Sequence, residues 1–325
     1  MMELCHSFKV RTYCATFNHE NYIIDALKGF SMQQTTFPVV YTIVDDASTD
    51  RTAAVIKQFV GENFNLGDTS VGYDKDTDYG HVTFARHKTN ENCYFAVIYL
   101  KENHYSQKKS KNPYLTEWMD TKYIAMCEGD DYWTDPLKLQ KQVSFMDAHE
   151  EYSMCFHGAD VLDDVNEECQ YSSLKEGDYT ARDIYDSWLV PTCSVVYSRT
   201  EKPFESNPAI VYGDIFLYLQ LAERGKIHCM GTIGSVYRRH SGGLSYEEDG
   251  KKMMALAKQY RWLAKRFPQE ELRGISLRKE NEYLKGVLYD EDLNGVWKCR
   301  LRYAWLHPHL LFSRFMLQTI KYLKQ

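Results

Sequence analysis

Three carboxylates lie within four residues in Glu128-Gly129-Asp130-Asp131, directly after the apolar run 123–127. Carboxylates crowded onto one loop repel each other unless a cation neutralises them, and oxygen ligands favour a hard divalent ion such as Mg²⁺ or Mn²⁺. Such an ion usually keeps several waters and bridges to the phosphates of a substrate. The same residues could instead form an acidic turn that caps the helix expected after Pro136, and the local spacing does not separate these two interpretations.

Two further polar groups follow apolar runs. Thr16 and Asn18 come after one run, and Asp45 and Asp46 come after the β-branched run 39–44. Carboxylates in such places are common turn residues, but they could also accept a hydrogen bond from a nucleobase while Asn18 helps to hold the nucleotide and a metal takes its diphosphate. No G-x-G-x-x-G follows the first run, and G-x-x-x-x-G-K-[ST] is absent from the sequence, so Rossmann hydride transfer and P-loop phosphoryl transfer lose their main support.

These polar groups occur in a pattern of alternating strands and helices. Runs 8–14, 39–44 and 123–127 are typical of buried strands, and helical spacing follows each of them. We also expect a weaker strand at 81–85, a buried helix at 94–100, a surface loop at 102–111, strands at 194–197 and 234–237, and a helix at 214–224. The pattern predicts an α/β fold, with a mainly parallel sheet flanked by helices and with the three polar groups at one edge, where ligands bind.

Composition excludes several classes of protein. The chain has 325 residues, 44% of them hydrophobic, and a net charge of -6, so nothing favours nucleic-acid binding. Its apolar stretches are shorter than the roughly 18 residues that a membrane span needs. The N-terminus lacks the features of a secretory signal, so we expect the protein in the cytoplasm. Nine scattered cysteines without a C-x-x-C pair argue against a zinc knuckle and against a disulfide framework.

Four segments in order together resemble the family 2 glycosyltransferases with the GT-A fold, and especially bacterial members that build cell-surface polysaccharide. The resemblance covers roughly residues 8–245. The segments are Thr16-Phe17-Asn18-His19 with Tyr22 and Ile23, then Val44-Asp45-Asp46-Ala47-Ser48-Thr49-Asp50, then Glu128-Gly129-Asp130-Asp131-Tyr132-Trp133, and finally Tyr237-Arg238-Arg239-His240-Ser241-Gly242-Gly243.

The resemblance implies roles for particular residues on the donor side. Thr16, Asn18 and one aspartate of the pair Asp45 and Asp46 would line the nucleotide pocket, and Arg86 would contact the nucleotide or its diphosphate. The resemblance also implies that the acidic loop holds Mn²⁺ or Mg²⁺ and the donor. The matching residues, of which either could be the direct ligand, are Asp130 and Asp131.

Two residues later in the chain complete the implied site. His240 would be a third metal or diphosphate contact, although a lone histidine beside two arginines is often a surface residue. Asp214 would be the general base. It follows Gly213 where the family usually has a glutamate, and at a helix N-terminus it could simply be a cap.

Together these parts predict a metal-dependent, inverting hexosyltransferase. It would move a sugar from a nucleotide-sugar, by family habit a UDP-sugar, to a hydroxyl of a glycan or lipid-linked acceptor in surface polysaccharide synthesis. Two alternatives remain: a metal-dependent nucleotidyltransferase, and a catalytically silent carbohydrate- or nucleotide-binding protein with the same fold, which the glycine at position 213 keeps open.

The C-terminal part differs in character from the rest. We predict a glycosyltransferase domain at 1–245 and a helical region at 246–325 whose final segment, 296–325, has six basic and no acidic residues. Interleaved aromatic residues suit a segment that lies on an anionic membrane surface, which would place the protein at the inner face of the cytoplasmic membrane. The alternative is a helical cap that packs its aromatic residues on the catalytic domain.

Overall fold

The computed structural model describes residues 7–163, 170–243, 250–287, 293–307, 319–321 and 323. The chain divides into two compact units. The first takes in residues 1–180, 189–202 and 221–239, and the second takes in 181–188, 203–220 and 240–325. The longest segment of the second unit begins at residue 240, close to the predicted domain boundary at 245. Two earlier segments of the chain belong to the same unit.

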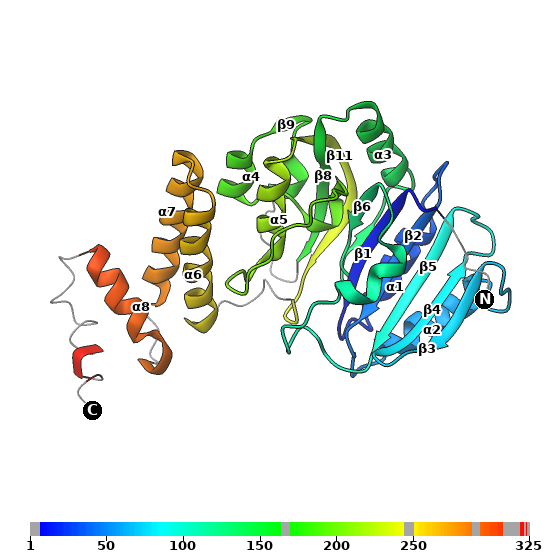
Figure 1. The fold of residues 1–325 in the computed structure, drawn as a ribbon, viewed down its shortest axis with the longest axis horizontal. Coiled ribbons are helices and arrows are strands. Elements are labelled where there is room, and N and C mark those ends of the chain that lie inside the picture. The colour runs from blue at the N-terminus through cyan, green and yellow to red at the C-terminus, as the bar shows by residue number, and fades with distance from the viewer. Residues whose placement is uncertain are drawn as a thin grey trace. The chain divides into compact units, whose positions relative to one another are not determined.

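The first unit is built on one mixed sheet with the strand order β3-β4-β5-β2-β1-β6-β10-β8-β11-β7, in which β9 also pairs with β11 (Figure 1). The strands are β1 (Val10–Thr16), β2 (Val39–Asp45), β3 (Gly72–Asp76), β4 (Gly80–Arg86), β5 (Cys93–Leu100), β6 (Tyr123–Met126), β7 (Tyr132–Trp133), β8 (Tyr152–Asp163), β9 (Gly177–Tyr179), β10 (Val196–Ser198) and β11 (Lys226–Arg239). Because β5, β2, β1 and β6 pair in parallel, their carboxyl ends meet at one edge, as predicted.

Helices cover the sheet because each presents an apolar stripe to it. These helices are α1 (Ile23–Ser31), α2 (Thr52–Asn63) and α3 (Lys138–Ala148). In α1, the buried residues Ile23, Ala26, Leu27 and Phe30 recur at helical spacing. They join a core with Trp133 and residues of all three helices. A separate cluster on other strand residues includes side chains of the 3₁₀ helix η1 (Asn112–Trp118). Short 3₁₀ helices also span Gln170–Ser173 and Thr192–Ser194.

The predicted helix at 94–100 is wrong, because this segment is the strand β5. Every residue of β5 is buried, and the strand lies between β2, with parallel pairing, and β4, with antiparallel pairing. A strand buried on both faces is a continuous apolar run, and such a run lacks the alternation that separates a strand from a short buried helix.

The second unit is helical, as the sequence predicts for the C-terminal region. It contains α4 (Ala181–Ser187), α6 (Gly250–Arg266), α7 (Glu270–Val287) and α8 (Leu293–Leu306), and it takes in most of α5 (Gly213–Ala222). The rings of Tyr260 and Tyr283 stack with centroids 5.6 Å apart and join α6 to α7. The buried Glu280 of α7 pairs with Arg261 of α6 and Arg302 of α8. These contacts make α6, α7 and α8 one packed group.

Only part of the predicted basic tail belongs to the described residues. Tyr303 of α8 is buried in a cluster with Ala257, Leu284 and Val287, whereas Trp305 is 70% exposed. Residues 308–318, 322, 324 and 325 lie outside the described part. Among the helices that are described, none is both long and apolar enough to cross a membrane.

Candidate functional site

The loop after β1 is locked to the loop after β2. The Asn18 N–H donates to Ser48 Oγ at 2.9 Å, and Asn18 Oδ1 accepts the Thr49 N–H at 2.8 Å. Asn18 has a φ of 55°, a left-handed conformation that asparagine tolerates better than most residues. The turn brings His19 to the start of α2, where the His19 N–H donates to Thr52 Oγ1 at 2.7 Å. Asn18 is therefore part of the framework of this edge.

Asp45 and Asp46 are both buried, and their surroundings differ. Asp45 ends β2 and accepts hydrogen bonds from the Ser48 N–H and hydroxyl. Burial raises the pKa of Asp45, and the bonds from Ser48 offset part of that rise. Asp46 accepts the N–H groups of His104 at 2.7 Å and Tyr105 at 3.0 Å.

The loop after β5 therefore closes on Asp46. Lys111 Nζ lies 2.9 Å from Asp46 Oδ2, which adds an ion pair to the two backbone hydrogen bonds. His104 Nε2 lies 3.0 Å from the Tyr114 hydroxyl, so the loop is also held to η1. The sequence predicted a surface loop at 102–111 and gave no sign that its backbone would bind this carboxylate. Asp46 holds the loop at the carboxyl edge, and Asp45 lies beside it.

The acidic loop packs directly against the end of β1. The Gly129 N–H donates to the Ala15 carbonyl at 2.9 Å. A Cβ at position 129 would lie 2.6 Å from both Cβ and Oγ1 of Thr16, closer than real Cβ contacts allow. The glycine is thus required by the close approach of the two loops. Thr16, predicted to line a nucleotide pocket, is buried beneath this contact.

The two aspartates of the acidic loop face different surroundings. Asp131 is 1% exposed, and its Oδ1 accepts the Arg238 N–H of β11 at 2.8 Å. Burial and the neighbouring Asp130 raise the pKa of Asp131 well above its usual range. The side chain of Asp130 keeps 16% of its surface exposed, and its Oδ2 lies 3.9 Å from His19 Nε2. Asp130 is therefore the more accessible of the two aspartates, and Asp131 anchors the loop to β11.

Arg238 fastens the acidic loop from a second side. Its Nη1 donates to the Asp130 carbonyl at 2.8 Å, and its Nη2 pairs with Asp25 of α1. The guanidinium also lies over the rings of Tyr22 and Tyr132, 5.4 and 4.6 Å from their centroids. These described contacts of Arg238 hold the acidic loop in place.

Arg86 does not join the other predicted nucleotide ligands. It ends β4, which runs antiparallel to β5, and it pairs with Tyr94 at the start of β5. Residues at the start of β5 lie at the amino ends of the parallel strands, opposite the edge formed by Thr16 and Asp45. The sequence missed this because the direction of β4 depends on the hairpin that joins it to β5. We leave Arg86 out of the candidate site.

Asp214 and His240 belong to the second unit. Asp214 lies in the first turn of α5, where its Oδ1 accepts the Ile215 N–H at 2.7 Å. His240 is buried and directly follows β11, two residues after Arg238. The Gly243 N–H donates to the His240 carbonyl at 2.9 Å, so a tight turn folds over this histidine. A Cβ on Gly242 would lie 3.3 Å from His240 Nδ1, so the glycine leaves room beside the ring.

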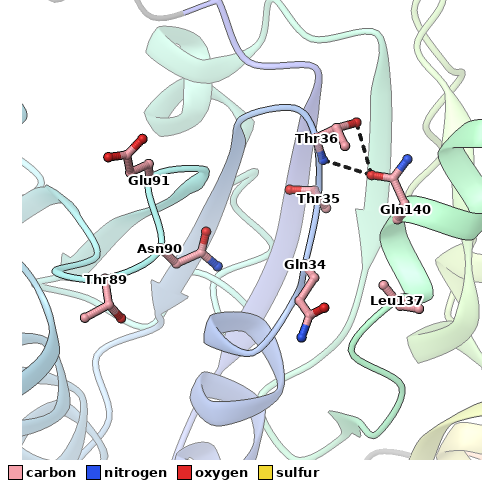
Figure 2. A pocket seen from close by; sticks show the side chains of 8 residues that line it. All are labelled: Gln34, Thr35, Thr36, Thr89, Asn90, Glu91, Leu137 and Gln140. Carbon is pink, nitrogen blue, oxygen red and sulfur yellow. Dashed lines mark hydrogen bonds between the residues drawn. The ribbon is translucent and has the colours of Figure 1, made fainter.

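A cavity of about 550 Å³ lies elsewhere on the first unit. Figure 2 shows its polar lining, in which Gln140 Oε1 accepts hydrogen bonds from the N–H and hydroxyl of Thr36. The lining residues precede β2 and β5 or lie at α3, so the cavity is at the amino ends of the strands. They are Gln34, Thr35, Thr36, Thr89, Asn90, Glu91, Leu137 and Gln140. None of the predicted site residues is among them.

Comparison with known proteins shows the family. The model of glycosyl transferase family 2 matches residues 14–202. The chain belongs to glycosyl transferase family 2. Uncharacterized proteins of Mycobacterium tuberculosis and Mycobacterium bovis are each 33% identical to it over 232 residues, 70% of this chain. This family 2 chain spans 58% of the length of those relatives.

Solved structures resemble the fold of this family 2 chain. Residues 1–349 of Staphylococcus aureus TarS in complex with UDP-GlcNAc match with a TM-score of 0.53 and 15% identity, over 90% of this chain and 76% of that one. The mannosyltransferase PcManGT of Pyrobaculum calidifontis in complex with GDP-Man and Mn²⁺ matches with a TM-score of 0.50 and 12% identity, over 98% and 84%. The predicted GT-A fold with C-terminal helices is confirmed.

Proposed function

We propose that this family 2 protein transfers a sugar from a nucleotide-sugar, in particular a UDP-sugar, to a hydroxyl of a glycan or lipid-linked acceptor in surface polysaccharide synthesis. The observation that carries the proposal is the meeting of three loops at the carboxyl edge of the sheet, which brings Asp45 beside Asn18 and places Asp130 opposite His19. TarS with UDP-GlcNAc and PcManGT with GDP-Man have related folds. Nothing in the described residues favours the nucleotidyltransferase alternative.

On the donor side, the residues hold the nucleotide by hydrogen bonds and shape. Asp45 is the carboxylate that accepts from a base N–H, because Asp46 is already taken by two backbone amides and Lys111. Asn18 shapes the rim of the pocket through its bonds to Ser48 and Thr49. Thr16 acts by seating the acidic loop. These contacts are made between groups of the protein itself, so we expect little reorganisation on binding.

The acidic loop suits a divalent cation, Mn²⁺ or Mg²⁺. Asp130 offers an accessible carboxylate oxygen, and oxygen donors suit both ions. When bound, the ion would stabilise the charge on the departing nucleoside diphosphate as a Lewis acid. We assign Asp130 as the carboxylate ligand of the ion. We also assign His240, which directly follows β11, as a further ligand. Asp131 acts by positioning the loop through the Arg238 amide.

Asp214 is the general base in this proposal. Its carboxylate takes the proton from the acceptor hydroxyl, whose oxygen attacks the anomeric carbon as the bond to the diphosphate oxygen breaks. One base with direct displacement inverts the anomeric configuration. The preceding Gly213 is exposed, and a Cβ there would meet no atom within 4 Å. The position that usually holds a glutamate is therefore open space beside the base, available to an acceptor.

The test is nucleoside diphosphate release from a panel of sugar nucleotides in the presence of Mn²⁺. We expect release with one donor, its loss in excess chelator, and its loss in Asp130→Ala. A matched control is Asp120→Ala, which removes an exposed carboxylate paired with Arg199 and should leave turnover unchanged. Full turnover in excess chelator would contradict the metal dependence. Tight nucleotide binding without release from any donor would favour the silent binding protein.

A further inference from the structure

The imidazole of His19 faces Asp130, the more accessible of the two aspartates in the acidic loop. His19 Nε2 and Asp130 Oδ2 are 3.9 Å apart, and the side chains keep 15% and 16% of their surface exposed. An N–H···O hydrogen bond spans about 2.7 to 3.2 Å, so this atom pair is too far apart to share a proton directly. By contrast, His81 lies 2.8 Å from Asp74 and 2.9 Å from Asp76, in direct contact. The distance between His19 Nε2 and Asp130 Oδ2 thus leaves room for an ion between these two atoms.

The separation fits a bridging ion. Two donors that each lie about 2.1 Å from one ion are about 3.0 Å apart at a right angle and about 4.2 Å apart when they face each other across it. The 3.9 Å between His19 and Asp130 falls inside that range. A carboxylate oxygen is a donor that Mn²⁺ prefers, and imidazole is a ligand of several divalent first-row ions. The distance therefore leaves room for one bridging ion between the two donors.

The backbone of His19 is fixed independently of any ligand. Its N–H donates to Thr52 Oγ1 at 2.7 Å, and its carbonyl accepts the N–H groups of Tyr22 and Ile23 at 2.9 Å each. The residue is thereby held between the start of α2 and the start of α1. The left-handed φ of Asn18 sets the direction in which the chain enters this position. Little freedom remains for the histidine except rotation of its ring.

Asp130 is fixed just as firmly from the other side. Gly129 packs against Thr16, the Asp130 carbonyl accepts from Arg238 Nη1, and Asp131 holds the Arg238 amide. The donor pair therefore comes from two loops in direct contact within the first unit. Ligands held on rigid loops bind an ion without a large ordering cost.

We propose that His19 is a direct ligand of the divalent cation, together with Asp130. The inference rests on the proposed function, since the ion is the one that would bridge to the donor diphosphate. It adds a nitrogen ligand from the loop after β1, a segment to which sequence reasoning assigned only nucleotide contacts. His19 would couple the two halves of the donor pocket, because the loop that shapes the nucleotide rim would also hold the metal.

The test uses Mn²⁺ alone and then Mn²⁺ with UDP, on the full chain. Electron paramagnetic resonance of free Mn²⁺ gives the affinity, and spin-echo modulation reports ¹⁴N nuclei bound to the ion. Since loss of groups that merely support a metal ligand costs about 10- to 100-fold in affinity, His19→Gln should weaken Mn²⁺ binding by at least about tenfold. With His240 as a second nitrogen ligand, His19→Gln and His240→Gln should each reduce the ¹⁴N modulation, and the double variant should abolish it.

The control is His81→Gln, which removes a histidine in direct contact with two carboxylates and should change neither measurement. Melting temperature and metal-free UDP binding show whether His19→Gln is folded. Unchanged affinity and ¹⁴N modulation in His19→Gln, with binding lost in Asp130→Asn, would overturn the His19 ligand and leave the proposed function standing. Wild-type protein that binds no Mn²⁺ with or without UDP would overturn both the inference and the metal dependence.

Discussion

The neighbouring carboxylates at the carboxyl edge of the sheet differ in their contacts and exposure. Asp46 and Asp131 are each bound by backbone N–H groups of segments distant in sequence. Asp45 and Asp130 lie next to them in the chain, and Asp130 is the member of its pair with an accessible side chain. A buried carboxylate that accepts amide hydrogen bonds fixes a loop strongly, because leaving those groups unpaired is costly. Each pair thus supplies one residue that holds a loop, and in the proposed function the other residue contacts the ligand.

A substitution at Asp214 can distinguish its capping role from its proposed role as general base. Asn at this position keeps an oxygen that can accept the Ile215 N–H but cannot take a proton at neutral pH. Asp214→Asn should therefore lower turnover by about a hundredfold or more. Donor affinity and melting temperature should stay close to those of the wild type. Steady-state kinetics with calorimetry would check this, and an intact rate with lowered stability would show that Asp214 is a cap only.

At the residue scale, the sequence predicted which residues gather at one edge of the sheet but could not assign a role to each. Thr16, Asn18, Asp45 and Asp130 meet there because each ends or follows a parallel strand, and that much can be predicted from periodicity. The ion pair of Lys111 with Asp46 spans 65 positions and depends on a loop without regular structure. His19 carried no signal of its own beyond its place in a motif. No local sequence pattern predicts such long-range side-chain contacts.

Elements determine which residues share an edge, and strand direction decides the outcome. The short connection between β4 and β5 makes the pair antiparallel, and this reverses β4 and takes Arg86 to the opposite edge. A parallel β4 would have brought its end to the site. The strand β5 belongs to the same region. Its apolar run fits a buried helix as well as a strand, so the sequence did not distinguish the two. The wrong helix at 94–100 and the expected place of Arg86 both follow from uncertainty about this one strand.

The contact between the acidic loop and β1 makes Gly129 a test of element packing. In Gly129→Ala, the new Cβ would press on Thr16 from 2.6 Å, so the loop must shift. Overpacking of this kind costs about 1 to 3 kcal/mol, and we expect lower stability together with weaker Mn²⁺ and donor binding. Gly61→Ala is the matched control, because its Cβ would meet nothing within 4 Å and lies on an exposed turn of α2. It should raise stability by up to about 1 kcal/mol and leave binding unchanged.

Asp147 joins α3 to the starts of β1 and β6, and its ionisation predicts a pH dependence. Burial alone would raise the pKa of Asp147, but hydrogen bonds from Lys122, Lys9 and Tyr123 outweigh it and lower the pKa to about 2. Because the folded-state pKa is depressed from 3.8, the stabilisation is present above about pH 4 and is lost as the pH falls toward 2.

Asp147→Asn should therefore destabilise the protein at neutral pH by about 1 to 2 kcal/mol, a value discounted for solvent screening. Chemical denaturation of both proteins at several pH values would check it. The gap between them should narrow between about pH 4 and pH 2. A constant gap over that range would show that the contacts of Asp147 act through packing and not through its charge.

At the scale of the whole molecule, charge is distributed unevenly along the chain. Segment 296–325 has a formal charge of +6 in a chain of -6, which leaves -12 for residues 1–295. In the described part of this segment, two aromatic side chains differ in exposure. Tyr303 packs with α6 and α7 of the same helical unit, whereas Trp305 is 70% exposed and Arg302 lies 5.0 Å from its ring. An exposed tryptophan beside basic residues is typical of a surface that meets lipid headgroups.

We therefore predict that this segment binds anionic membranes, which would bring the transferase to a lipid-linked acceptor. Full-length protein should sediment with anionic liposomes at low salt and be released at high salt, because each basic residue near the surface contributes about 1 kcal/mol. Lys298→Glu with Trp305→Ser should weaken this binding by about tenfold or more. The control Lys285→Glu makes the same charge change on an exposed position of α7 and should have little effect. Equal sedimentation of the two variants and the wild type would leave α8 with the packing role alone.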